Sequence, residues 1–177
     1  MKRKIIFLFL LLPLSATIKA QQGNNQMKIA AEVGFPSGGY HTGYGVFFKG
    51  LLGVGSSGQL TLTTGVSRFG SSGSNDVTGS VVRLIPFMAG YRQNIGKFYI
   101  EPQIGYGDFG GRITMNGDYA RPSIAAFFWS AATGFNFKRF DAGVKFQSAH
   151  GAEGSAAGTW HNSSFQYTAV YLGVNLF

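Results

Sequence analysis

The sequence of 177 residues predicts an all-β protein, an eight-stranded antiparallel up-and-down transmembrane β-barrel with short turns at one end and longer loops at the other. Three observations lead to this fold class. The composition has 27 glycines and 15% aromatic residues but only 12% charged residues, about half the ~25% that soluble domains usually carry. Beyond residue 20, apolar residues alternate with polar or small ones in eight segments, with no clear helical period. The connections between these segments alternate between short and long.

Period-2 alternation defines the segments, because successive side chains of a strand point to opposite faces. The segments are 27–36, 44–54, 58–69, 81–93, 98–107, 123–137, 140–149 and 165–177. In each segment we expect the apolar row to face lipid and the polar, charged or small row to face the inside of a closed barrel. No run of 18 apolar residues follows residue 20, so we expect no transmembrane helix.

The hairpin 81–107, VVRLIPFMAGYRQNIGKFYIEPQIGYG, is the clearest part of this pattern. In its first strand the alternate residues of 82–88 are apolar, and we assign them to lipid. The row that contains Arg83 is then assigned to the interior. In its second strand the row of Glu101 is polar or small. A three-residue turn at 94–96, with a left-handed glycine at its end, places the rows of Arg83 and Glu101 on one face.

The connections predict how the barrel sits in a membrane. Short ones are expected at 55–57, 94–96 and 138–139, and long ones at about 37–43, 70–79, 108–122 and 150–163. Outer-membrane barrels have short periplasmic turns and long extracellular loops. An even number of strands then returns both ends of the mature chain to the periplasm. If Ser37 pairs with Tyr44 across the first loop, Glu32 falls opposite Lys49 on the inner face.

Seven charged side chains fall on the rows assigned to the interior. They are Lys28, Glu32, Lys49, Arg83, Glu101, Asp141 and Lys145. An unpaired buried charge is costly, so these groups are expected to form ion pairs with one another. The near balance of charge predicts an interior filled by side chains, as eight strands allow, and not a wide water-filled pore.

Residues 1–20 have the features of a secretory signal peptide. Lys2, Arg3 and Lys4 precede the apolar stretch 5–14, and Ala20 is the expected cleavage point. The stretch is too short for the alternative, an uncleaved anchor helix. Removing residues 1–20 removes four Lys/Arg and no acid, so the formal charge falls from +8 to +4. We therefore expect residues 21–177 to be one barrel domain, and we do not interpret the basic charge as nucleic-acid binding.

The signal peptide, the eight segments, the hairpin RLIPFMAGYR…FYIEPQIGYG and the ending YLGVNLF together resemble the small outer-membrane β-barrel proteins common in Bacteroidetes, often called porin-family or OmpA-like barrels. The resemblance implies integral insertion in the cell outer membrane, among its lipids and lipopolysaccharide. A terminal Phe177 resembles the recognition signal of the barrel-assembly machinery, although Gly173 and Asn175 stand where apolar residues are usual. The family shares a fold and not an activity, so function does not follow from it.

No pattern in the sequence predicts a metal, cofactor or catalytic site. His41, His150 and His161 fall in or next to expected outer loops without ligand spacing, and we interpret them as solvated residues. The chain has no cysteine, which excludes disulfides and thiolate sites. We therefore expect a non-enzymatic protein with a structural role or a surface-binding role through its long loops, whose ligand the sequence does not identify.

Three alternatives are open at this point. A lipid A or phospholipid-modifying barrel enzyme would need a Ser/His/acid cluster at one rim. Barrel deacylases carry a His and a Ser two apart on a late strand, and here Ser148 and His150 stand in the reverse order. A small-solute pore would need an open lumen. A soluble barrel that binds an apolar ligand would need its charged rows to face water.

Overall fold

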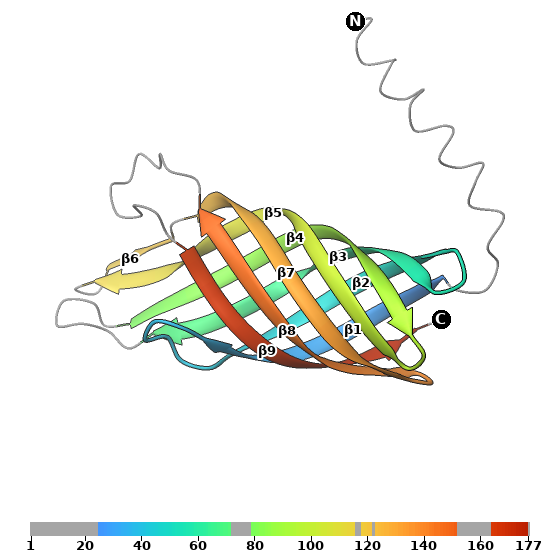
Figure 1. The fold of residues 1–177 in the computed structure, drawn as a ribbon. Coiled ribbons are helices and arrows are strands. Elements are labelled where there is room, and N and C mark those ends of the chain that lie inside the picture. Colours follow the sequence, from blue (N-terminus) through green and yellow to red (C-terminus); the bar gives the residue numbers. More distant parts are fainter. Residues whose placement is uncertain (1–24, 72–78, 116–117, 122, 152–163, 177) are drawn as a thin grey trace, which may run out of the picture.

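The computed structural model describes residues 25–71, 79–115, 118–121, 123–151 and 164–176, which form a closed antiparallel β-barrel (Figure 1). The expected signal peptide, His161 and Phe177 lie outside the described residues. The strands are β1 (Gln26–Pro36), β2 (Gly43–Val54), β3 (Gly58–Ser71), β4 (Gly79–Ile95), β5 (Phe98–Met115), β6 (Asp118–Ala120), β7 (Ser123–Phe137), β8 (Phe140–Gly151) and β9 (Ser164–Asn175). The described part of the chain contains no helix of the length and hydrophobicity that a membrane crossing requires.

The nine strand segments make an eight-stranded barrel, because β6 and β7 are two parts of one strand. Both pair with β5, and Ile113 opposite Ala120 has the same register as Gly110 opposite Ser123. Each of the other strands pairs with its neighbours in the sequence, and β1 pairs with β9 to close the ring. The predicted fold class is therefore confirmed.

Both ends of the described chain lie at the end of the barrel that carries the short turns (Figure 1). The amide of Leu176 donates to the carbonyl of Met27 over 2.8 Å. The turns 55–57 and 138–139 have the predicted lengths, since Val54 pairs with Gly58 and Phe137 with Phe140. The strand ends that the longer connections join all lie at the opposite end, which we call the loop end (Figure 1).

The two faces of the wall differ as predicted in seven of the eight segments. Large apolar side chains cover the outer face: Tyr106 is 69% exposed, Ile104 62% and Leu172 57%. On the inner face Glu101 is fully buried. A barrel surrounded by lipid is expected to have this arrangement, with apolar side chains outside and charged side chains inside.

The strand β4 is the exception, because the predicted rows are reversed. Its inner row is Val82, Leu84, Pro86, Met88 and Arg92, all of them buried, while Phe87 is 63% exposed on the outer row. The cause is the turn to β5. Ile95 pairs with Phe98, so the turn has two residues, Gly96 and Lys97, where three were predicted. Gly96 does have a positive φ of 65°, but a change of one residue in turn length exchanges the two faces of the preceding strand.

The interior has two layers along the barrel axis. Toward the loop end it is an apolar core, whose buried members are Phe69, Val82, Leu84, Met88, Phe109, Ala126, Phe128, Ala149, Phe165, Tyr167 and Ala169. Its aromatic rings fit because the wall carries glycine beside them. A Cβ atom on Gly34 would lie 2.8 Å from the ring of Phe69 and 3.0 Å from that of Tyr167. Toward the turn end most of the buried side chains are charged or polar, with Leu51 and Ala132 among the apolar ones.

Candidate functional site

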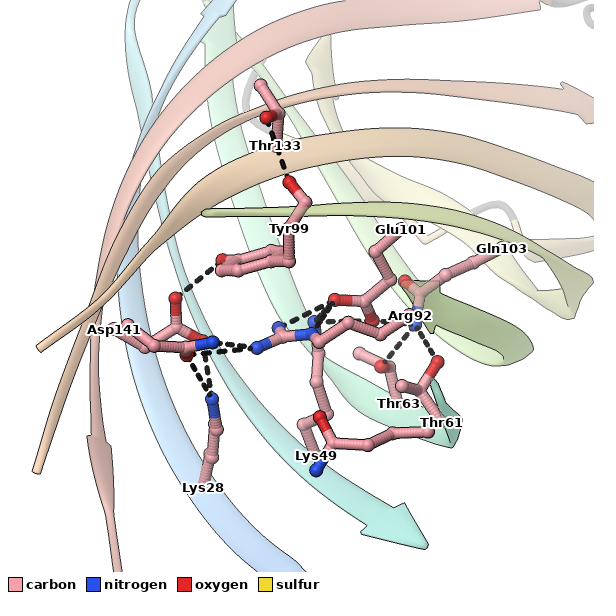
Figure 2. Close-up of polar contacts among 12 residues, drawn as sticks. Lys28, Lys49, Thr61, Thr63, Arg92, Tyr99, Glu101, Gln103, Thr133 and Asp141 are labelled. Carbon is pink, nitrogen blue, oxygen red and sulfur yellow. Dashed lines mark hydrogen bonds and ion pairs between the residues drawn. The ribbon is translucent and has the colours of Figure 1, made fainter. Parts of the chain in front are cut away.

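Arg92 lies at the centre of the polar layer and joins two carboxylates (Figure 2). Its Nε and Nη2 donate to Oε2 of Glu101 over 2.8 and 2.6 Å, and its Nη1 donates to Oδ2 of Asp141 over 3.1 Å. Arg92 and Glu101 are fully buried, and Asp141 is nearly so. The planar guanidinium can hold two carboxylates at once, which the single ammonium of a lysine does less well.

Two lysines complete this cluster, one beside each carboxylate. Lys28 donates to Oδ2 of Asp141 over 2.8 Å, and Lys49 donates to Glu101 over 2.8 and 3.0 Å. The two lysines come from neighbouring strands and stand opposite each other, because Gly34 pairs with Gly43 across the first loop. The predicted placement of Glu32 opposite Lys49 is therefore wrong: Glu32 lies opposite Gly45.

Neutral side chains bind the remaining lone pairs of these carboxylates. The hydroxyl of Tyr99 donates to Oδ1 of Asp141 over 2.5 Å and lies against the hydroxyl of Tyr171. The guanidinium of Arg92 stacks 3.6 Å above the centre of the Tyr99 ring. Gln103 donates to Oε1 of Glu101 over 2.9 Å. The ion pairs are thus embedded in a hydrogen-bonded network, as buried charges require.

A second ion pair lies nearer the loop end. Lys145 contacts Oε2 of Glu32 at 2.7 Å, and its ammonium group lies 3.9 Å from the centre of the Phe47 ring. Oε1 of Glu32 accepts hydrogen bonds from Ser67 and Tyr167 over 2.9 and 3.0 Å. This pair adjoins the apolar core, to which Tyr167 also belongs.

Six of the seven charged residues predicted for the interior therefore lie there and form ion pairs. Arg83 does not, because it is on the outer row of β4, where its Nη2 pairs with Oδ2 of Asp108 at 2.7 Å. The sequence analysis missed Arg92, which the misjudged turn assigned to the lipid side. With Arg92 in place of Arg83, the described interior holds four cations and three carboxylates, a formal charge of +4 − 3 = +1.

Side chains fill most of the described interior. Between the lysines and Glu32 there is a cavity of about 30 Å³, room for about two water molecules. At the turn end an open vestibule of about 410 Å³ is lined by polar side chains, including Asn94 and Asn136. Asn136 accepts hydrogen bonds from Lys28 and Arg92 over 3.2 and 3.4 Å. The ion pairs thus close the vestibule, and the apolar core lies beyond them.

The structure brings Ser148 and His150 together on the outer row of β8. The Ser148 hydroxyl and His150 Nε2 are 2.9 Å apart, and Ser148 is fully buried while His150 is exposed. Within the described ranges no carboxylate is hydrogen-bonded to His150, and no group of three His, Cys, Asp or Glu residues is arranged for a metal ion. His41 lies in the first long connection, and its amide donates to the carbonyl of Gly70 over 2.7 Å.

Neither a protein-family model nor a curated protein matches the chain. Among solved structures, the N-terminal barrel domain of Pseudomonas aeruginosa OprF superposes with a TM-score of 0.63 at 13% identity, covering 88% of this chain and 100% of that domain. Ail of Yersinia pestis superposes with a TM-score of 0.61 at 14% identity, covering 88% and 99%. The chain has the fold of the small outer-membrane β-barrels.

Proteins of this fold differ in what they do. Ail, described as an attachment invasion locus protein, has also been solved with the heparin analogue sucrose octasulfate. The outer-membrane enzyme PagL superposes with a TM-score of 0.53 at 15% identity, covering 83% of this chain and 98% of its own. The shared fold therefore does not decide between a binding protein and an enzyme.

Proposed function

We propose that this protein is a non-enzymatic, integral outer-membrane barrel that passes no solute and whose loop end is a binding surface. The observation that carries this proposal is the closed interior, in which the Arg92 ion pairs and the apolar core follow one another along the axis. Side chains that fill a lumen and bond to one another stabilise a wall but leave no path through it. The part of the protein left to meet a ligand is its outer end.

The orientation and origin of the protein belong to the same proposal. Residues 1–20 act as its export signal, the short turns and both mature ends face the periplasm, and the barrel-assembly machinery inserts it. The outer face contacts membrane lipid and lipopolysaccharide, and the protein is of the Bacteroidetes type that its sequence resembles. Ail, a barrel of the same fold with a bound polyanion, supports a loop end that binds ligands.

Membrane placement predicts a heat-dependent mobility on gels. The exposed apolar face, with Tyr106 and Ile104 more than half exposed, should keep the folded barrel in the membrane fraction. Unboiled samples in SDS should run faster than boiled ones, because the closed barrel is more compact than the unfolded chain. Recovery from the soluble periplasmic fraction, with one gel position before and after boiling, would favour the alternative of a soluble barrel.

The closed interior predicts that purified protein in planar lipid bilayers gives no stepwise conductance above the background of empty micelles. The ion pairs of Arg92 and the buried rings of Phe69 and Phe128 support this expectation, because they occupy space that a water-filled pore would need. The variant Arg92→Ala is a useful comparison, since it removes the largest side chain at the centre of the polar layer. Steady conductance by the unaltered protein would contradict the proposal.

A non-enzymatic role predicts unchanged membrane lipids. Mass spectra of outer-membrane lipids from a deletion strain, a normal strain and an overproducer should show the same acyl-chain distribution. The Ser148→Ala variant is the matched control for the Ser148–His150 contact. A species that loses or gains one acyl chain with overproduction, and does not do so with Ser148→Ala, would identify a lipid-modifying enzyme.

A further inference from the structure

Three lysines of the barrel interior line one small cavity. The cavity, of about 30 Å³, is bordered by Lys28 of β1, Lys49 of β2 and Lys145 of β8. Lys28 and Lys49 stand opposite each other in the β1–β2 ladder. Lys28 and Lys145 are 2% and 7% exposed, and the side chain of Lys49 is 15% exposed. Three cationic side chains therefore meet at a place with little access to bulk water.

The ammonium groups of these lysines have more donors than the protein uses. Each ammonium group carries three N–H donors. Within the described residues, the side-chain oxygens that these groups contact number two for Lys28, two for Lys49 and one for Lys145. Each ammonium group thus keeps at least one N–H for a further acceptor. Thr63, which also lines the cavity, accepts a hydrogen bond from Gln103 over 2.7 Å and has its own hydroxyl hydrogen to donate.

Two carboxylates line the same cavity, but their oxygens already have donors. Oδ1 of Asp141 accepts from a tyrosine, and its Oδ2 accepts from a lysine and an arginine. Oε1 of Glu32 accepts from a serine and a tyrosine, and its Oε2 contacts Lys145. These carboxylates hold the lysines in place without using all of their donors.

The charge of the interior is positive by one. Its four cations and three carboxylates give a formal charge of +4 − 3 = +1. No other acidic residue belongs to this layer of the described structure: Asp108 forms an ion pair on the outer face, and Asp118 is in β6 at the loop end. Asp76 and Glu153 lie outside the described residues, in connections between strand ends beyond the apolar core. An uncompensated buried charge is costly, so the layer favours one further negative charge.

We infer that this cavity binds one chloride ion between the ammonium groups of Lys28, Lys49 and Lys145. A chloride ion accepts hydrogen bonds from several N–H groups and cancels the excess charge, whereas a water molecule would meet the donors and leave the charge. The space for about two water molecules admits a monatomic anion and is too small for phosphate or sulfate. The inference concerns the barrel interior alone and does not depend on the proposed binding surface.

The test is urea unfolding of the refolded protein in lipid vesicles, in mixtures of sodium chloride and sodium gluconate at constant ionic strength. Gluconate is too large for the cavity, and the two salts screen surface charges equally. For a dissociation constant of about 10 mM, raising chloride from about 1 mM to about 100 mM should lower the unfolding equilibrium constant about tenfold. An equal unfolding constant in the two salts would overturn the inference, and is also the result expected if one of the lysines is uncharged.

Two variants show whether the chloride effect arises in the cavity. Lys49→Met removes one ammonium group and brings the interior to zero formal charge, while Glu101 keeps Arg92 as its partner. This variant should unfold equally in both salts. Lys97→Met is the matched control, because Lys97 is exposed in the turn between β4 and β5, and it should keep the full chloride effect. A chloride effect that persists in Lys49→Met would contradict a site between the lysines.

A second measurement needs no variant. Crystals of the unaltered protein grown in sodium bromide should show an anomalous difference peak in the cavity, because bromide has the charge of chloride and nearly its size. Density for water alone at that position, without an anomalous signal, would also overturn the inference.

Discussion

Replacing Arg92 with methionine is expected to lower the free energy of unfolding by about 3–5 kcal/mol, the cost of breaking a buried ion pair by removing one partner. Arg92 is fully buried and joins Glu101 to Asp141. Methionine fills much of the same volume but leaves each carboxylate with a lysine as its only remaining cation. Urea unfolding of the refolded protein in lipid vesicles, followed by tryptophan fluorescence, measures the loss.

Two further variants show whether charge or geometry is responsible. Arg139→Met, at an exposed turn position, should change the unfolding free energy by no more than about 0.5 kcal/mol. Arg92→Lys keeps the charge but not the planar group, so its loss of unfolding free energy should lie between those of Arg92→Met and Arg139→Met. If Arg92→Met were as stable as Arg139→Met, the ion pairs would not stabilise the barrel.

The second large loss of unfolding free energy is expected when Glu32 is replaced. Glu32→Leu leaves the ammonium group of Lys145, which is 7% exposed, without its carboxylate. It also removes the acceptor of Ser67 and Tyr167. We expect a loss of about 3–5 kcal/mol in the same unfolding assay. Thr64→Leu is the matched control: Thr64 is exposed on the outer face of β3, so its replacement should cost no more than about 0.5 kcal/mol.

A double variant tests whether the loss comes from the unpaired charge. Adding Lys145→Met to Glu32→Leu should recover part of the stability, because no lone charge is then buried. Lys49→Leu should cost less than Glu32→Leu, since Glu101 keeps Arg92 as a partner. Equal losses for Glu32→Leu and Thr64→Leu would contradict the assignment of the two faces.

The prediction of which side chains of a strand face inward depended on one row being apolar and the other polar, charged or small. Seven segments have that contrast, and there the sequence alone identified which row faces inward. In β4 both rows are apolar along most of their length, since Leu84 and Met88 belong to the apolar core while Ile85 and Phe87 face outward. Each row of β4 carries one arginine, so charge did not distinguish them: Arg83 lies on the outer row near the loop end and Arg92 on the inner row.

The sequence of the turn between β4 and β5 indicates which row of β4 faces inward. The stretch Ile95–Gly96–Lys97–Phe98 closes as a two-residue hairpin with a left-handed glycine at its first turn position, a pattern that favours the tight turn. Assigning it that way would have placed Arg92 inside and Arg83 outside. The partners of each charge could not be predicted, because pairs such as Lys28 with Asp141 depend on the stagger between distant strands.

The ion pairs of the polar layer join segments that are far apart in the chain, and this bears on the order of folding. Lys28 of β1 and Asp141 of β8 are separated by 113 positions, and Arg92 and Asp141 by 49. A sheet assembled from β1 through β5 would still have Lys28 without its carboxylate. The final pairing of β9 with β1 and β8 is therefore the step that completes the network. Closure of the ring should accordingly be strongly cooperative, and partial unzipping at the β1–β9 seam should be rare, since it would separate strands that position buried charges.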